Sequence, residues 1–184
     1  MLKLSFILFF CVALKNHSPV HTVSYTVIQN TNIVDVIAGR IIPHQTIIIK
    51  DSLLSKIFRH NNQKFPANAK IIDGKNKFLM PGLWDMHFHL AWDSANDRAL
   101  FNILLQYGIT GIRDMGGSLT ILNKFKNEVR NNKQIGPEIF GAGPIIDGNP
   151  PVQKDFSLPV DSLTDITFQL DSLKNNGTDF LKVY

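Results

Sequence analysis

Hydrophobic and polar residues follow different patterns on the two sides of Met80. Before it, short apolar runs rich in β-branched residues are bounded by Gly, Pro and Asn. The runs are VSYTVIQN (23–30), QTIIIKD (45–51), SKIFRH (55–60), AKIIDG (69–74) and KFLM (77–80). Runs of this length with such boundaries predict β-strands. We therefore expect residues 23–79 to form a small β-sandwich or meander.

After Met80, strand-like runs alternate with helix-like stripes. The runs are GLWDMHFHL (82–90), ITGIRD (109–114), EIFGAG (138–143) and DFLKVY (179–184), and helices are expected near 95–107, 119–131 and 163–175. This alternation predicts βαβ units and a parallel sheet of four strands. Two stripes are expected to face the core: Leu100, Ile103, Leu104 and Tyr107, and then Leu163, Ile166, Leu170 and Leu173.

The run 82–90 contains two histidines at positions i and i+2. Strict alternation would place one set on a polar side, Asp85, His87 and His89, and another on a helix-facing side, Trp84, Met86, Phe88 and Leu90. Two imidazoles so spaced can bind one metal ion. They can equally form hydrogen bonds inside the fold, or one can face solvent at the strand end. The pair alone leaves these interpretations open.

Composition limits the choice of partners and ligands. The 184 residues are 44% hydrophobic and 18% charged, which is enough for a buried core in one domain or parts of two. The net charge of +4 is scattered, with no block of five or more like charges, so we expect no nucleic-acid partner. The only cysteine, Cys11, lies near the N-terminus, so any metal site in a processed chain must use N and O ligands.

The N-terminus has the pattern of an export signal. Lys3 precedes an apolar run from Leu4 to Leu14, which is too short to span a bilayer. We expect residues 1–22 to be a signal peptide or lipoprotein leader, and the protein to be periplasmic, secreted or lipid-anchored. A lipid anchor at Cys11 would be the membrane attachment, although the bulky Phe10 precedes it. The alternative is a buried strand or helix.

The run MPGLWDMHFHL (80–90) resembles the first barrel strand of the metal-dependent amidohydrolase superfamily, whose usual form is P-G-x-x-D-x-H-x-H. YGITGIRDMGG (107–117), GPEIFGAGPIIDG (136–148) and NGTDFLKVY (176–184) resemble its second, third and fourth strand segments. The β-rich piece that leads into IIDGKNKFLMPGL (71–83) is similar to its N-terminal sandwich. The nearest branch is that of imidazolonepropionases and Xaa-Pro dipeptidase-like enzymes, and the resemblance is to their N-terminal half only.

The resemblance implies a (β/α)8 barrel of the TIM type with one or two divalent ions at the C-terminal ends of its strands. His87 and His89 carry over as metal ligands. Lys182 carries over as a lysine that CO2 converts to a metal-bridging carbamate. We expect zinc, and Mn2+, Fe2+ or Co2+ would fit the same ligands. Alternatively, Lys182 forms a salt bridge inside the barrel or extends to solvent.

Three further positions lie near the ends of the predicted strands. Arg113 and Asp114 are candidates for substrate contact or for bracing a ligand, and a mutual ion pair is the alternative. Gly116 and Gly117 are expected to allow a tight turn. Asp147 could touch substrate, but a turn is the preferred interpretation.

The predicted barrel is incomplete. A (β/α)8 barrel needs about 250 residues, and residues 80–184 provide 105. We expect this segment to be the first half of the barrel in a longer enzyme, or a truncated gene product, with the other half supplied by a longer chain. The lone fragment should not turn over substrate. In KDSLLSKI (50–57) the glycine usual in the family's hairpin turn is absent, so Ser52 or a neighbour must tolerate the bend.

The function implied by the resemblance is hydrolysis of a C–N bond in a small molecule by a metal-activated water. An amide, a cyclic amide or a dipeptide would serve as substrate. Arg113, Asp114 and the carbamylated Lys182 would be the catalytic-face residues beside the histidines. The alternative is a catalytically inactive exported fragment or paralogue that acts as a binding module.

Overall fold

The computed structural model describes residues 23–93 and 97–184. Its contacts divide the chain into two units, Met1–Met80 and Pro81–Tyr184. The expected leader, residues 1–22 with Cys11, lies outside the described residues, so export and lipidation stay predictions. Within the described ranges, no helix combines the length and apolar character needed to cross a bilayer.

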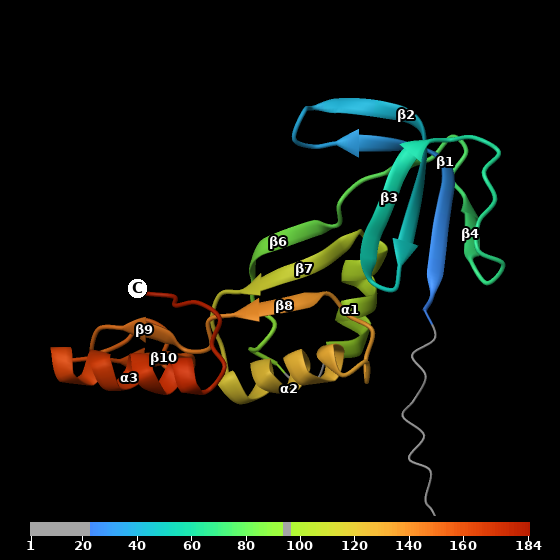
Figure 1. The fold of residues 1–184 in the computed structure, drawn as a ribbon. Helices are drawn as coiled ribbons and strands as arrows, with labels where there is room; N and C mark the ends of the chain where they lie inside the picture. The colour runs from blue at the N-terminus through green and yellow to red at the C-terminus, as the bar shows by residue number, and fades with distance from the viewer. Residues whose placement is uncertain (1–22, 94–96) are drawn as a thin grey trace, which may run out of the picture. The chain divides into compact units, whose positions relative to one another are not determined.

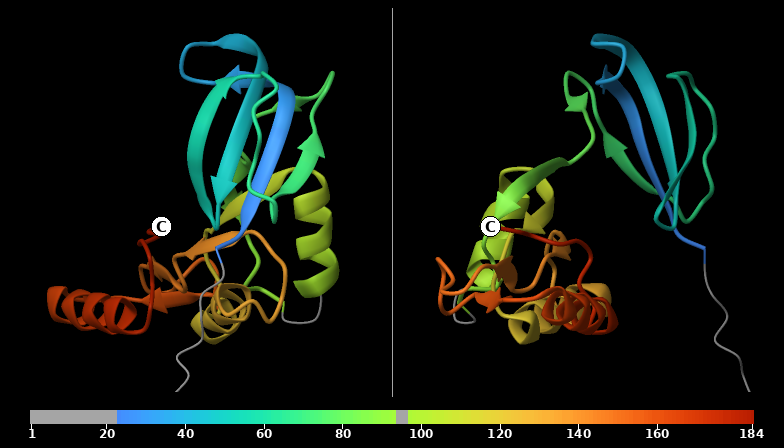
Figure 2. Two further views of the ribbon diagram at one scale, coloured as in Figure 1. Left: turned by 45° about the vertical axis from the view of Figure 1, so that its right-hand side comes forward. Right: turned by 90° about the vertical axis from the view of Figure 1, so that its left-hand side faces the viewer.

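The first unit contains one five-stranded sheet. Its strands are β1 (Tyr25–Asp35), β2 (Arg40–Lys50), β3 (Leu53–Arg59), β4 (Lys70–Asp73) and β5 (Phe78–Leu79). The order is β3-β2-β1-β4, which the left-hand view of Figure 2 shows across the sheet, and β5 also pairs with β1. β2 is antiparallel to β1 and β3, whereas β4 and β5 run parallel to β1. The strand-rich character is therefore confirmed.

Of the two expected forms, the meander is seen, because β1, β2 and β3 pair antiparallel in chain order, and the sandwich stays a prediction. All five strands belong to the same hydrogen-bonded sheet, and the buried side chains gather on its central strands, as with Val27, Ile47 and Ile48. Large apolar side chains of the outer strands, such as Leu53 and Ile71, stay exposed. A second sheet would have to cover them, because sandwiches bury the inner faces of two sheets. The described unit is one layer.

The turn between β2 and β3 forms without a glycine. Asp51 adopts a φ of 54°, in the left-handed region. Aspartate tolerates this region because its short side chain can form a local hydrogen bond. Here Asp51 Oδ1 accepts a bond of 3.0 Å from the Ser24 backbone N–H. Asp51, and not Ser52, therefore takes the strained position.

The second unit begins with the expected strand–helix alternation. Its elements are β6 (Leu83–Phe88), α1 (Asp97–Gln106), β7 (Ile109–Asp114), α2 (Leu119–Arg130) and β8 (Glu138–Gly141). The strands form a parallel sheet in the order β6-β7-β8, visible side by side in Figure 1. This mixed α/β arrangement confirms the coarse fold class predicted from the sequence.

The fourth predicted strand, 179–184, does not form a regular strand. After β8 come β9 (Ile145–Asp147), β10 (Ser157–Pro159) and α3 (Leu163–Asn175), and β9 pairs with β10 in a separate sheet. Residues 179–184 make a single parallel bridge, from Val183 to Ile146. The segment bonds to Gly141 at the end of β8 and then to Ile146 of β9, so it does not pair along the length of β8. The parallel sheet has three strands, and the described residues form no closed barrel.

Helices α1 and α2 cover one face of the main sheet. The rings of Phe101 and Phe125 meet edge to face, with centroids 5.7 Å apart, and both pack with Ile112 and Ile139 of the strands. Burial of such side chains contributes about 1.5–3 kcal/mol each. The core of this unit therefore lies between the two helices and the sheet.

The predicted helix stripes were only partly right. In α1, Leu104 is buried, but Ile103 is 50% exposed and Tyr107 is 75% exposed, and Phe101 packs into the core instead. In α3, Leu173 is buried, while Leu163 is 84% exposed. The physical reason is that only a narrow strip of each helix surface is packed against other residues, and the rest of the helix faces solvent. The prediction that both stripes lie in the core is wrong for these exposed residues.

Candidate metal centre

The two predicted ligands lie side by side at the C-terminal end of β6. The ring centroids of His87 and His89 are 5.3 Å apart, and the rings are inclined by 63°. His87 is exposed and His89 is half-buried. The i, i+2 spacing therefore brings the two imidazoles together at the strand end where parallel α/β folds place their sites.

The orientation of His89 is fixed by two contacts. Its Nδ1 lies 3.2 Å from the Gly116 carbonyl oxygen, and its ring lies 4.3 Å from the Trp92 ring, centroid to centroid. A carbonyl oxygen only accepts hydrogen bonds, so Nδ1 is the protonated nitrogen in this contact. In the neutral imidazole, the form that binds a metal ion, the lone pair is then on Nε2. This arrangement, with one nitrogen held by a carbonyl, is typical of metal-binding histidines.

The face assignment of Asp85 was wrong because β6 is irregular. Asp85 pairs with Ile112 and Phe88 pairs with Asp114, so one extra residue of β6 lies between two neighbouring pairs. Such an insertion breaks strict alternation. Asp85 is thereby aligned with Ile112 of the core face, and its Oδ1 accepts a 3.0 Å hydrogen bond from the His87 backbone N–H.

Trp84 also lies on the face opposite to the predicted one. Its ring contacts Phe140 with a centroid distance of 5.5 Å, whereas the neighbouring Ile139 belongs to the core under the helices. The contact passes over Gly111, where a Cβ atom would come within 2.3 Å of the indole. Gly111 is therefore required for this close approach. Phe88 and Leu90 pack with the helix core as predicted.

Asp114 braces the strand end that carries His89. It is fully buried, and its Oδ2 accepts hydrogen bonds of 2.7 Å from the backbone N–H groups of Leu90 and Ala91. Its Oδ1 accepts a 3.1 Å bond from Gly116 N–H. Burial raises the pKa of the Asp114 carboxyl above its usual range, while three backbone donors and the charge of His89 act in the opposite direction. Of the alternatives for Asp114, this geometry favours bracing.

Arg113 lies on the opposite face of β7, as adjacent strand residues do. Its guanidinium carbon lies 4.3 Å from the centroid of the Phe180 ring. Within the described chain, no ion pair joins Arg113 to Asp114. The proposed mutual ion pair is therefore wrong, and Arg113 stays a candidate for substrate contact.

Lys182 lies in the segment that pairs with β9. Its ammonium nitrogen is 4.9 Å from the centroid of the Tyr184 ring. Among the residues that the structure describes, no hydrogen bond or ring contact connects Lys182 to His87 or His89. In the same ranges, no three His, Cys, Asp or Glu side chains are grouped closely enough to hold a metal ion. The role of Lys182 as a third ligand stays a prediction.

Asp147 forms a turn. Its two carboxylate oxygens accept backbone hydrogen bonds from Gly148, at 2.8 Å, and from Val152, at 2.7 Å. These local bonds agree with the preferred interpretation. The turn at Gly116 and Gly117 also forms as expected. Gly117 is needed there, because a Cβ atom at this position would lie 2.8 Å from the Ala91 backbone.

Sequence reasoning missed an aromatic group beside the histidines. The Trp92 ring, which packs on His89, also stacks on Phe156 at a centroid distance of 5.0 Å with an interplanar angle of 4°. The two aromatic residues are far apart in the chain and belong to no spacing pattern. Only the fold brings them together.

Comparison with solved structures identifies the fold. A candidate prolidase from Bifidobacterium longum superposes with a TM-score of 0.77 at 22% identity, over 87% of this chain and 40% of its own. A prolidase complexed with N-methylphosphonate-L-proline gives 0.72 at 21% identity, over 87% and 46%. A Xaa-Pro dipeptidase with methionine in its active site gives 0.69 at 20% identity, over 87% and 47%. The described chain has the fold seen in part of each of these prolidase and dipeptidase structures.

Sequence comparison adds less. No family model matches the chain. An adenine deaminase from Staphylothermus marinus is 27% identical over 88 residues, which are 47% of this chain and 14% of the deaminase. The chain spans less than half the length of the prolidase and dipeptidase structures named above. The resemblance inferred from the motifs is confirmed at the level of the fold.

Proposed function

We propose that the full-length protein is a metal-dependent hydrolase of C–N bonds. The observation that carries this proposal is the paired imidazoles of His87 and His89, with the Nδ1 of His89 held by a backbone carbonyl. The proposal includes a complete (β/α)8 barrel, to which β6, β7 and β8 would contribute the first strands. The fold shared with prolidase structures, over 87% of this chain, supports it.

The residues present fit part of a divalent-metal site. Two neutral imidazoles are nitrogen donors that suit Zn2+ and also Mn2+, Fe2+ or Co2+. Carbamylated Lys182 would add an oxygen donor. When bound, the ion would lower the pKa of a coordinated water and polarise the carbonyl of the scissile bond.

The chain's own residues would position the reaction. Gly116 holds the proton on Nδ1 of His89 through its carbonyl, and Asp114 ties that turn to the end of β6. Arg113, on the face of β7 away from the helices, would bind an anionic group of the substrate. This assignment suits a dipeptide, whose terminal carboxylate matches the guanidinium.

The test is a hydrolysis assay of the Zn2+-loaded full-length protein on Xaa-Pro dipeptides, other dipeptides, N-acyl amino acids and cyclic amides. We expect release of an amine from at least one class, loss of this activity on chelation, and recovery on adding Zn2+ back. Circular dichroism of the chelated protein controls for unfolding. Absence of turnover across all four classes would contradict the proposal.

A second expectation concerns Trp92. Replacing Trp92 by alanine should loosen the orientation of His89, because one of its two orienting contacts is lost and only the Gly116 contact remains. Since groups that orient a metal ligand are worth about 10-fold to 100-fold in metal affinity, zinc affinity should fall toward that range. Isothermal titration with Zn2+ measures it, and Trp92→Phe is the control that keeps a stacking ring. Equal affinities for wild type and Trp92→Ala would show that the stack does not orient the ligand.

A further inference from the structure

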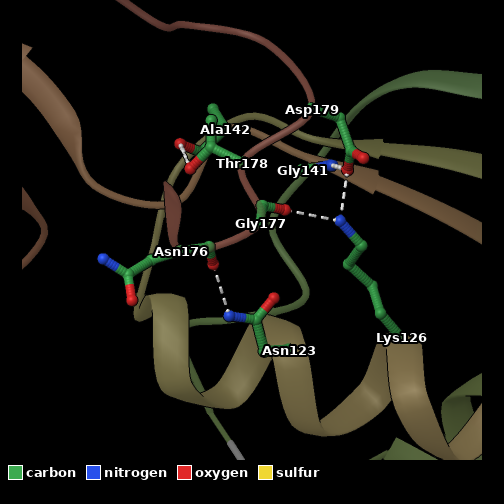
Figure 3. Close-up of polar contacts among 8 residues, drawn as sticks. All are labelled: Asn123, Lys126, Gly141, Ala142, Asn176, Gly177, Thr178 and Asp179. Atoms are coloured by element: carbon green, nitrogen blue, oxygen red, sulfur yellow. Dashed lines mark hydrogen bonds and ion pairs between the residues drawn. The ribbon is translucent and has the colours of Figure 1, made fainter. Parts of the chain in front are cut away.

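Lys126 of α2 is a charged side chain in a buried place. Only 5% of it is exposed, and its ammonium donates hydrogen bonds of 2.7 Å to the Gly177 carbonyl and to Asp179 Oδ2, as Figure 3 shows. The Asp179 side chain is 19% exposed. Burying either charge alone would be unfavourable, so the two are matched. The pair joins α2 to the chain that follows α3.

Asp179 also binds the end of β8 in two ways. Its backbone N–H donates a 3.0 Å bond to the Gly141 carbonyl, and its Oδ2 accepts a 2.8 Å bond from Gly141 N–H. The carboxylate therefore takes the place that a backbone carbonyl of a neighbouring strand would occupy. Lys126, Gly141 and Asp179 together are called the register clamp below. The clamp fixes where the segment 179–184 starts along β8.

A second attachment follows within a few residues. Ile146 N–H donates to the Lys182 carbonyl at 2.9 Å, and Tyr184 N–H donates to the Ile146 carbonyl at 3.0 Å. Phe180 and Leu181 are the only residues between Asp179 and Lys182. An extended chain rises about 3.3 Å per residue and alternates its side chains, so a slip of one residue would turn Lys182 to the other face.

We propose that Lys126 and Asp179 are positioning residues that set the register of the segment 179–184 and so present Lys182 to the metal centre. This inference rests on the proposed function for the role of Lys182. Buried ion pairs are often replaceable by apolar residues without loss of stability, and their better attested use is to select one arrangement. Register selection is therefore the effect to measure, separately from stability.

The test compares Lys126→Met/Asp179→Leu, which leaves no unpaired buried charge, with wild type in the full-length protein. Hydrogen exchange reports the pairing of Ile146 and Tyr184, and 13C-bicarbonate NMR reports carbamylation of Lys182. We expect cooperative unfolding to be kept, exchange of both amides to accelerate, and the carbamate signal to be lost. Zinc affinity should fall about 10-fold to 100-fold.

Two comparisons make the result specific. Lys133→Met and Asp171→Asn remove exposed charges outside the clamp and should behave as wild type. Lys126→Arg keeps the cation and should restore the slow exchange. Wild-type exchange and carbamylation in the folded double variant would overturn the inference. If the double variant does not fold, the same readouts on Asp179→Glu decide, and unchanged exchange again overturns it.

The exchange readout needs neither metal nor activity, so it separates two failures. One outcome is faster exchange in the double variant together with no carbamate signal even in wild type. It would support the clamp as a register device but overturn its assignment to Lys182. If alanine variants of His87 and His89 keep their metal, the proposed function fails, whatever the exchange rates of the clamp variants.

Discussion

Replacing His87 or His89 by alanine should strip the full-length protein of its divalent metal. Structural zinc sites bind with about 10–16 kcal/mol shared among four ligands, or about 3 kcal/mol each, so losing one imidazole should weaken binding by about 100-fold. The loss should be similar at the two positions because the rings are neighbours at one strand end. Metal content after dialysis, measured by mass spectrometry, checks this expectation.

The matched control is His44→Ala. His44 is an exposed histidine of the first unit, and its Nδ1 contacts the Asn30 side chain. Its replacement should leave metal content unchanged. Equal metal content in His87→Ala, His89→Ala and wild type would remove the support for a metal centre on β6. A loss confined to His89→Ala would show that the exposed His87 is no ligand.

Local sequence patterns predicted those features of the fold that depend on neighbouring residues. The alternation of β6, α1, β7, α2 and β8 follows from hydrophobic periodicity, which each element carries in its own sequence. The irregularity of β6 between Asp85 and Phe88 depends on how it pairs with β7, and periodicity contains no trace of it. The face of Trp84 was therefore mispredicted, although the strand itself was found.

In the candidate site, too, local features were predictable from the sequence and contacts between distant segments were not. The proximity of His87 and His89 was predictable because two residues of one strand are held together by the backbone. Contacts between distant segments were not predictable, as with Trp92 and Phe156 or Lys126 and Asp179. The motif resemblance supplied candidates such as Lys182 and Asp114, but only the fold shows that Asp114 receives three backbone hydrogen bonds.

Replacing Asp114 by alanine should cause the largest loss of stability among the substitutions considered. The change leaves three N–H groups of Leu90, Ala91 and Gly116 without their acceptor. Each unsatisfied buried group costs about 1–3 kcal/mol, a large share of the roughly 5–15 kcal/mol that stabilises a typical domain. Urea unfolding of the metal-free protein measures the loss. Asp85→Ala is the control, because Asp85 accepts a single backbone hydrogen bond in an exposed place, and equal losses in the two variants would contradict the bracing role.

The pH dependence of stability tests the same carboxyl independently. Burial raises the pKa of Asp114 in the folded protein, so the unfolded chain loses this proton first, near the ordinary carboxyl pKa of about 3.9. Above that pH the folded state binds more protons than the unfolded state, and stability falls as pH rises until Asp114 ionises in the folded protein. Asp114→Asn does not titrate, so the stability of wild type relative to this variant should be greatest in acid and decline with rising pH. A relative stability that increased with pH would mean that the three backbone donors outweigh burial. The carboxyl of Asp114 would then lose its proton at a lower pH in the folded protein than in the unfolded chain.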